Sequence, residues 1–291
     1  MKIYVNGAYH DKADAKISVF DHGVLYGDGV FEGVRAYSGR IFRLDEHLRR
    51  LEQSANAIFL KLPLPSRKIG KALIETVRVN GLKDAYIRLV VTRGIGDLGL
   101  DMRKCKDGAG LFIIADQIEL YPEAYYEKGL KVITSSIRQR SPDQLSPAIK
   151  SLNYLANILA RAEAARAGAQ EAILLNRQGF VSECTGDNIF FVYDGGIYTP
   201  PLRAGILEGV TRDAVMELCR DKLGKPVVER LFSPIELYRA QEVFLTGTGA
   251  EVISAGTIDG HRIGPGSTGP VTKKIIKLFR ELANSTGAPV Y

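Results

Sequence analysis

Residues 146–154 read SPAIKSLNY and place one lysine, Lys150, between a proline-ended loop and an alanine-rich apolar segment. The composition of that segment predicts a helix from about Leu152 to Ala167. An amine flanked by apolar side chains is a candidate nucleophile that can form a Schiff base with a carbonyl group. Most lysines simply extend along the protein surface into water, so Lys150 needs support from the rest of the chain.

The chain before this segment predicts a small α/β domain over residues 1–118. Asn6-Gly7 favours a hairpin turn, and amphipathic patterns predict two helices. The expected helices are Leu44–Ile58 and Ser66–Val79, and the expected strands are Val30–Tyr37, Ala85–Thr92 and Leu111–Ala115. Residues 118–128 (IELYPEAYYEK) are polar and aromatic without a clean period. They predict an interdomain linker at 119–128.

The remaining residues, 129–291, predict a larger domain that is rich in antiparallel strands and forms a pseudobarrel. Helices are expected at Val210–Leu223 and Gly269–Ala283, with a polar loop at 138–147. The expected strands are Leu130–Ile137, Glu171–Leu175, Phe180–Ser182, Asn188–Tyr193, Val227–Leu231, Glu242–Thr246 and Glu251–Ile258. The fold class is therefore α+β, in two α/β domains.

Composition excludes several classes of protein. The chain has 291 residues, of which 45% are hydrophobic, and carries a scattered net charge of +6. No basic stripe indicates a nucleic-acid partner, and no apolar run approaches the roughly 20 residues of a membrane helix. Three cysteines without a CxxC pair favour a reducing compartment. With no signal-peptide pattern at the start, a cytoplasmic location is expected.

Common catalytic fingerprints are missing. Residues 26–33 (YGDGVFEG) have the spacing G-x-G-x-x-x-G and precede a strand, which argues against a dinucleotide loop. Neither G-x-x-x-x-G-K-[ST] nor G-x-S-x-G occurs, and the four histidines show no metal-binding spacing. Hydrolase, kinase and metalloenzyme functions lose support, and no metal is expected.

Three places suit a phosphate-bearing cofactor. Residues 245–250 (LTGTGA) can direct backbone N–H groups at an anion, and residues 205–212 (GILEGVTR) lead into a helix N-terminus. Arg50 lies next to the apolar stripe of its helix and can reach inward. Each has a plain alternative: a simple turn, an N-cap at Thr211, or a solvated arginine. Glu183 breaks an apolar strand pattern, and buried acids are rare without a partner.

Taken together, these segments resemble the class IV (fold type IV) aminotransferases that use pyridoxal 5′-phosphate, and among them the branched-chain amino acid aminotransferases. The resemblance covers nearly the whole chain. Its most specific pieces, in order, are residues 21–33 (DHGVLYGDGVFEG), 149–154 (IKSLNY), 183–190 (ECTGDNIF), 207–212 (LEGVTR) and 246–249 (TGTG).

The resemblance implies a cofactor role for each matching position. Lys150 would bind pyridoxal 5′-phosphate and transfer the proton, and Glu183 would keep the pyridine nitrogen protonated. Tyr154 would contact the ring 3′-oxygen, and Leu207 would pack on the ring. The phosphate would be bound by Arg50, Val210, Thr211, Gly247 and Thr248.

The resemblance also implies the substrate site, which would lie between the two domains. The pocket residues would be Tyr26, Phe31, Gly33 and Tyr86, and the turn of Thr248, Gly249 and Ala250 would meet the α-carboxylate. Arg88 would accept the distal carboxylate of glutamate, while the role of Tyr121 stays open. The partners are then small amino acids and 2-oxo acids, and the family's assembly predicts a homodimer or higher homo-oligomer.

Alternatives within this fold are D-amino acid aminotransferases, (R)-amine transaminases and aminodeoxychorismate lyases. The D-specific enzymes carry basic residues soon after the segment that corresponds to residues 91–94, where this chain reads IGDLGLD at 95–101. That difference favours L-amino acids. A protein that binds the cofactor or an anion without turnover is disfavoured, because both Lys150 and Glu183 are present.

Overall fold

The chain divides into two units, each built around its own sheet and core. The computed structural model describes residues 1–118 and 120–291. The first unit comprises residues 1–118, 149–153 and 283–291, and the second comprises residues 119–148 and 154–282. The first unit therefore takes in two short segments that the sequence alone assigns to the larger domain.

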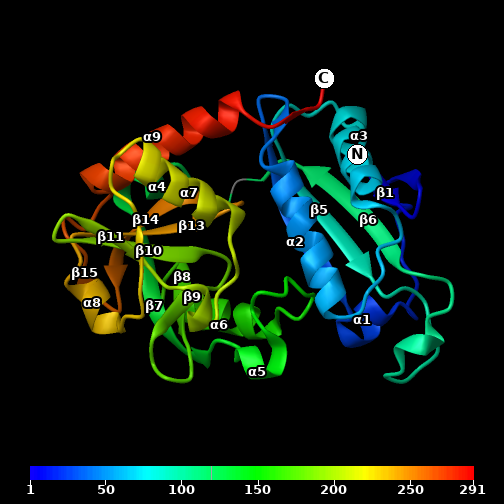
Figure 1. The fold of residues 1–291 in the computed structure, drawn as a ribbon, viewed down its shortest axis with the longest axis horizontal. Coiled ribbons are helices and arrows are strands. Elements are labelled where there is room, and N and C mark those ends of the chain that lie inside the picture. Colours follow the sequence, from blue (N-terminus) through cyan, green and yellow to red (C-terminus); the bar gives the residue numbers. More distant parts are fainter. Residues whose placement is uncertain (119) are drawn as a thin grey trace. The chain divides into compact units, whose positions relative to one another are not determined.

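The first unit contains one seven-stranded sheet with strand order β16-β4-β3-β5-β6-β1-β2. Its elements are β1 (Lys2–Val5), β2 (Ala8–Asp11), α1 (His22–Tyr26), β3 (Gly29–Tyr37), β4 (Arg40–Ile41), α2 (Leu44–Ala57), α3 (Ser66–Val79), β5 (Ala85–Thr92), β6 (Gly110–Asp116) and β16 (Ala288–Pro289). Figure 1 shows α2 and α3 lying along this sheet, where α2 packs on β3 and α3 on β6. Apolar residues of both helices and the central strands form one core.

The second unit contains a nine-stranded mixed sheet in which β7 has parallel neighbours on both sides, β8 and β14. Its elements are α4 (Ala124–Lys128), β7 (Leu130–Arg138), α5 (Pro142–Leu145), α6 (Leu155–Arg166), β8 (Glu171–Leu175), β9 (Val181–Cys184), β10 (Asn188–Tyr193), β11 (Gly196–Thr199), α7 (Val210–Asp221), β12 (Val228–Glu229), α8 (Pro234–Tyr238), β13 (Glu242–Gly247), β14 (Glu251–Ile258), β15 (His261–Arg262) and α9 (Pro270–Ser285). Helix α6 packs on β7 and β8, α7 on β13, and α4 on β14 (Figure 1).

The structure corrects several boundaries. The expected linker ends in helix α4, and the expected polar loop 138–147 contains helix α5. Helix α6 begins at Leu155 rather than Leu152, because Ser151 pairs with Val30 of β3 in an antiparallel bridge. The backbone of this segment thus completes a sheet edge instead of a helical turn. The sequence pattern does not predict helix α1; the Asp21 side chain caps it by accepting the Gly23 N–H (2.7 Å).

No helix within residues 1–118 and 120–291 combines the length and the apolar character needed to cross a bilayer. Cys105, Cys184 and Cys219 are free thiols. Burial raises the pKa of Cys219 to about 12 and that of Cys184 well above its usual value, so both are inert at neutral pH.

Candidate active site

Lys150 is fixed to the edge of the first sheet. Its carbonyl oxygen accepts the Phe31 N–H (3.0 Å), and its own N–H donates to Ser54 Oγ on α2 (3.1 Å). The Nζ atom lies 4.8 Å from the centre of the Phe31 ring. Both backbone polar groups of the lysine are therefore bound within the first unit, and its amine lies against an aromatic face.

The Phe31 ring also contacts a second cationic side chain, that of Arg88. The Arg88 Cζ atom lies 4.6 Å from the centre of the Phe31 ring, and its Nη2 donates to Tyr86 Oη (2.9 Å). Gly33 makes this arrangement possible, because a Cβ atom there would lie 2.4 Å from Tyr86 Oη. The first unit thus brings four predicted substrate residues and the lysine into one group.

Tyr26, the remaining predicted pocket residue of this unit, makes a different contact. It ends helix α1, and its hydroxyl accepts the Gly99 N–H (2.8 Å) from the loop between β5 and β6. Its ring packs edge-on against His22. Within this unit, Tyr26 therefore supports the loop at 93–109 rather than the group around Phe31.

Arg50 belongs to a buried charge cluster. Its Nε and Nη2 atoms donate to the two carboxylate oxygens of Glu32 (2.8 and 2.7 Å), which is fully buried. His47 Nδ1 lies 2.8 Å from Glu32 Oε2. Burial alone would raise the pKa of Glu32, but Arg50 and His47 outweigh it and lower that pKa from 4.5 to about 2. Burial also lowers the pKa of His47, so Glu32 is ionised and His47 is neutral at neutral pH.

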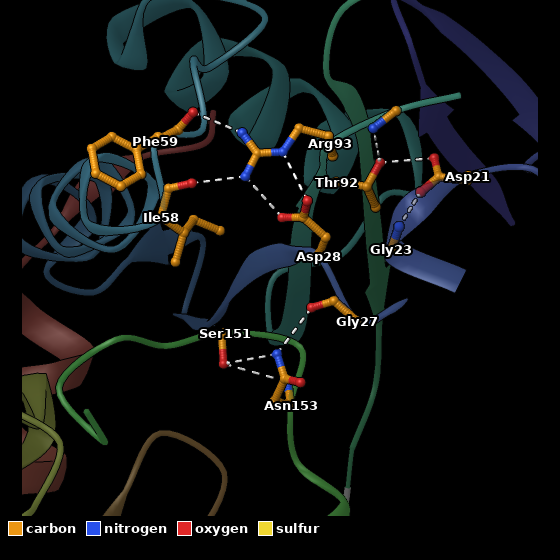
Figure 2. Close-up of polar contacts among 11 residues, drawn as sticks. Asp21, Gly23, Gly27, Asp28, Ile58, Phe59, Thr92, Arg93, Ser151 and Asn153 are labelled. Atoms are coloured by element: carbon orange, nitrogen blue, oxygen red, sulfur yellow. Dashed lines mark hydrogen bonds and ion pairs between the residues drawn. The ribbon is translucent and has the colours of Figure 1, made fainter. Parts of the chain in front are cut away.

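Figure 2 shows how the start of β3 is fixed beside the lysine segment. Arg93 donates to both carboxylate oxygens of Asp28 (each 2.9 Å) and to the carbonyl oxygens of Ile58 and Phe59 (each 2.7 Å). Asn153 Nδ2 donates to the carbonyl oxygen of Gly27 (3.0 Å). One buried arginine therefore ties the end of α2 and β5 to the loop that precedes β3.

Glu183 lies on β9 in the second unit and is 8% exposed. Its carboxylate accepts hydrogen bonds from Gln139 Nε2 (2.7 Å), Asn188 Nδ2 (3.2 Å) and the Leu207 N–H (3.0 Å). These three donors are neutral, and each hydrogen bond favours the charged form of the carboxylate.

Asn188 links Glu183 to the predicted phosphate site at the start of α7. Its Nδ2 also donates to the carbonyl oxygen of Leu207 (3.0 Å). A Cβ atom on Gly209 would lie 2.0 Å from Asn188 Oδ1, so glycine is required there. Gly209 is the N-cap of α7 and provides no side-chain cap, and the N–H groups of Val210 and Thr211 belong to the first turn. Such a helix start is suited to bind an anion.

The turn between β13 and β14 holds the other predicted phosphate and carboxylate ligands. Thr246 of β13 pairs with Asn188, and Asn188 donates to Glu183. The turn that follows β13 therefore begins next to a residue that contacts Glu183. Gly247 is sterically required, because a Cβ atom would lie 1.9 Å from Asp187 Oδ1. The Tyr126 hydroxyl donates to the carbonyl oxygen of Ala250 (3.1 Å). Thr248 and Gly249 are half-buried at the tip of this turn.

The structure places the two remaining tyrosines differently. The Tyr154 ring, at the start of α6, faces the Arg140 guanidinium at 6.0 Å. Tyr121 is 5% exposed, and its hydroxyl accepts a hydrogen bond from Arg161 Nη1 (3.1 Å). Burial raises the pKa of Tyr121 above its usual value. Tyr121 is therefore part of the core of the second unit.

Several polar residues of these groups are not among the predicted ligands, and four of them contact predicted residues directly: Glu32, Ser54, Gln139 and Asn188. Glu32 carries the same signal that singles out Glu183, a carboxylate inside an apolar strand pattern. Asn188 lies within the recognisable segment 183–190. Ser54 follows Arg50 by four residues and so lies on the same face of α2. Gln139 gives no local signal, because its contact with Glu183 joins residues 44 positions apart.

Each unit by itself holds groups that fit parts of a cofactor combining an aldehyde, a ring nitrogen and a phosphate. The first unit supplies an amine against an aromatic ring and a buried arginine. The second supplies an acid with neutral donors and a helix start without a side-chain cap. Thr246 Oγ1 is also buried without a hydrogen-bond partner in the described part of the chain, which leaves a donor for a ligand.

Three relatives show what this chain is similar to. It is 49% identical over 291 residues, covering 100% of this chain and 99% of the other, to a Methanocaldococcus jannaschii protein named provisionally as a branched-chain-amino-acid aminotransferase. A D-alanine aminotransferase of Bacillus licheniformis is 37% identical over 281 residues, covering 94% of each chain. The branched-chain aminotransferase of Thermoproteus uzoniensis, solved with norvaline, is 37% identical with a TM-score of 0.93, covering 100% of this chain and 99% of the other.

The family model described as amino-transferase class IV matches residues 29–258, most of the chain. This range includes the lysine segment, Glu183, the start of α7 and the turn after β13. Enzymes of this family depend on pyridoxal phosphate. The chain therefore belongs to the class IV aminotransferases.

Proposed function

We propose that this protein transfers the amino group of L-leucine, L-isoleucine or L-valine to 2-oxoglutarate, which gives a branched-chain 2-oxo acid and L-glutamate. One observation carries the proposal: Arg88 lies against the aromatic rings of Phe31 and Tyr86. A single site has to accept an aliphatic side chain in one half-reaction and a carboxylate in the other. Aromatic rings suit the first, and an arginine held beside them suits the second.

Different residues of the chain have the roles of binding the cofactor and transferring protons. Bound pyridoxal phosphate supplies an electron sink that stabilises negative charge at the substrate Cα. Lys150 Nζ binds the cofactor and carries the proton that leaves Cα. Glu183 would hold a proton on the pyridine nitrogen, with its oxygens oriented by Gln139, Asn188 and the Leu207 N–H.

The remaining ligands orient the cofactor and the substrate. Arg50, Thr248 and the backbone of Gly247, Val210 and Thr211 bind the phosphate. Tyr154 would contact the ring 3′-oxygen and Leu207 would pack on the ring face. The tip of the turn, Thr248 to Ala250, meets the α-carboxylate. A pocket role for Tyr26 rests on the resemblance alone, since its hydroxyl binds the loop between β5 and β6. The support for these roles is the resemblance and the donor sets described above.

A substrate panel tests the proposal. The purified protein is assayed with 2-oxoglutarate and L-leucine, L-isoleucine, L-valine, D-alanine or an (R)-amine, and glutamate formation is measured. We expect turnover with the three branched-chain L-amino acids. Faster turnover with D-alanine or the amine would overturn the proposal.

An Arg88→Ala variant tests the proposed carboxylate site. Because only glutamate brings a second carboxylate, the variant should lose more activity with glutamate than with leucine. Arg43→Ala is the matched control, since Arg43 also lies on an aromatic ring, that of Phe42 (5.7 Å), but next to the start of α2 and outside the group around Phe31. Equal losses for both donors would contradict the role of Arg88.

A D-amino acid aminotransferase is the second candidate, because the D-alanine enzyme of Bacillus licheniformis is 37% identical. The loop after β5 favours L-substrates, since residues 95–101 contain no basic side chain. The same panel separates the two functions.

We also propose that the protein is a homodimer at least. On α1 and in the loop between β5 and β6, Val24, Leu98 and Leu100 are 55%, 63% and 85% exposed, and the Tyr26–Gly99 hydrogen bond joins the two segments. Clustered apolar side chains of this kind mark contact surfaces. Analytical ultracentrifugation of the protein and of Leu100→Glu tests this: the dimer should dissociate in the variant, and a monomeric wild type would contradict the proposal.

A further inference from the structure

Ser54 is a buried helix residue whose hydroxyl contacts the lysine segment. It is 2% exposed on α2, and its Oγ accepts the Lys150 N–H at 3.1 Å. Buried hydroxyls on helices commonly bond a carbonyl of the preceding turn, as Thr76 does with the Ala72 carbonyl (2.7 Å) on α3. Ser54 instead serves a contact between elements.

The lysine segment has no regular structure of its own and depends on such contacts. The lysine segment lies along the same edge of β3 as β4. Of the β3 residues, β4 pairs with Ala36 and Tyr37. Residues 149–153 occupy the other end of that edge: Phe31 N–H donates to the Lys150 carbonyl (3.0 Å), and Leu152 N–H donates to the Gly29 carbonyl (2.9 Å). These bonds fix the lysine carbonyl side, and Ser54 fixes its N–H side.

We propose that Ser54 is a positioning residue that holds the backbone of Lys150 so that its amine lies against Phe31. The proposal rests on the function assigned above to Lys150. A Ser54→Ala variant leaves the Lys150 N–H without this acceptor, and the segment can then turn about its remaining bonds to β3. The amine loses its fixed direction, and reactions that need a defined approach of that amine become slower.

The test measures how fast the apo-protein captures pyridoxal 5′-phosphate on Lys150, by borohydride reduction and peptide mapping at timed intervals. One lost hydrogen bond of this kind corresponds to a change of about tenfold. We expect Ser54→Ala to capture the cofactor about tenfold more slowly and to lose kcat with little change in KM.

Ser135→Ala is the matched control. Ser135 is also 2% exposed and accepts a backbone N–H, that of Ile137 (3.0 Å), but it lies in the second unit on β7. Ser135 Oγ also donates to Glu163 Oε2 (2.5 Å), so Ser135→Ala should lose at least as much stability in urea as Ser54→Ala. Only Ser54→Ala should slow the capture on Lys150.

A second variant, Asn153→Ala, loosens the other end of the segment at an exposed position and should slow capture by a smaller factor. If Ser54→Ala and Ser135→Ala capture the cofactor equally fast, Ser54 has no positioning role. If the wild type carries no label on Lys150, the proposed function itself fails, and the two failures are thereby distinguished.

Discussion

Two buried glutamates, Glu32 in the first unit and Glu183 in the second, have opposite kinds of hydrogen-bond partner. Glu32 pairs with the guanidinium of Arg50 and contacts His47, whereas Glu183 accepts hydrogen bonds from neutral amides. A cation next to a carboxylate cancels its charge and fixes the local structure. Neutral donors keep the charge while orienting the oxygens. The comparison indicates that Glu32 stabilises the first unit and its arginine, and that Glu183 is arranged to act on a ligand.

The largest expected effect is on stability, from Glu32→Gln. This change leaves Arg50 buried without its counter-charge, and breaking a buried ion pair costs about 3–5 kcal/mol. Denaturation in urea measures the free energy of unfolding. A loss below about 1 kcal/mol would show that the cluster is not a structural ion pair.

Acid should weaken the wild type through the same cluster. The pKa of Glu32 is lowered from 4.5 to about 2, so its stabilisation is complete above pH 4.5 and disappears as the pH falls through about 2. The shift corresponds to about 3 kcal/mol. His47 acts in the same direction, because burial lowers its pKa and so opposes its protonation in the folded state.

The free energy of unfolding is compared for the wild type and Glu32→Gln from neutral pH downward. The difference between the two should shrink as the pH falls through the range set by Glu32. A difference that is constant with pH would contradict the assignment of an ionised Glu32.

Glu183→Gln should show the reverse pattern. The amide has nearly the same size, and the contacts to Gln139, Asn188 and Leu207 that it weakens come from neutral donors, so the stability loss should stay near 1–2 kcal/mol. Turnover should fall about 10²-fold or more, because a neutral amide cannot hold a proton on the pyridine nitrogen. Steady-state kinetics and urea denaturation are measured together. A variant that keeps its turnover would assign Glu183 a purely structural role.

The smallest effect is expected for Gln139→Ala, which removes one of the three donors to Glu183. Gln139 is 4% exposed, and the loss of one buried hydrogen bond costs about 1–2 kcal/mol. Cofactor affinity, measured by absorbance titration, should fall several-fold. Asn176→Ala is a control of similar chemistry outside the group, since Asn176 accepts the Gln178 and Phe180 N–H groups. Equal affinities for both variants would contradict the role of Gln139.

Much of the fold could be predicted from local pattern. Helix α3 and strand β5 have the predicted bounds, Ser66–Val79 and Ala85–Thr92, because each has a continuous amphipathic or apolar period. Helices α1, α4 and α5 have four or five residues, too few to show a period. The late start of α6 depends on the pairing of Ser151 with Val30, a tertiary contact that no local propensity encodes.

The residues of the candidate site also fall into those that the sequence predicts and those that depend on tertiary contacts. Lys150, Glu183 and the glycine-containing segments carry chemistry that the family signature marks. Their partners, Ser54, Gln139 and Asn188, are ordinary polar residues whose function depends on which element lies opposite. Glu32 could have been singled out from the sequence, because it interrupts an apolar strand as Glu183 does. Its pairing with Arg50 could not, because the two residues lie 18 positions apart on different elements.

The central claim is that Lys150 carries the cofactor. Borohydride reduction of the holoenzyme, digestion and mass spectrometry measure this directly. We predict a phosphopyridoxyl group on the peptide that contains Lys150, and none after prior treatment with L-leucine, which converts the cofactor to its unattached amine form. A label on another lysine, or no label at all, would contradict the account.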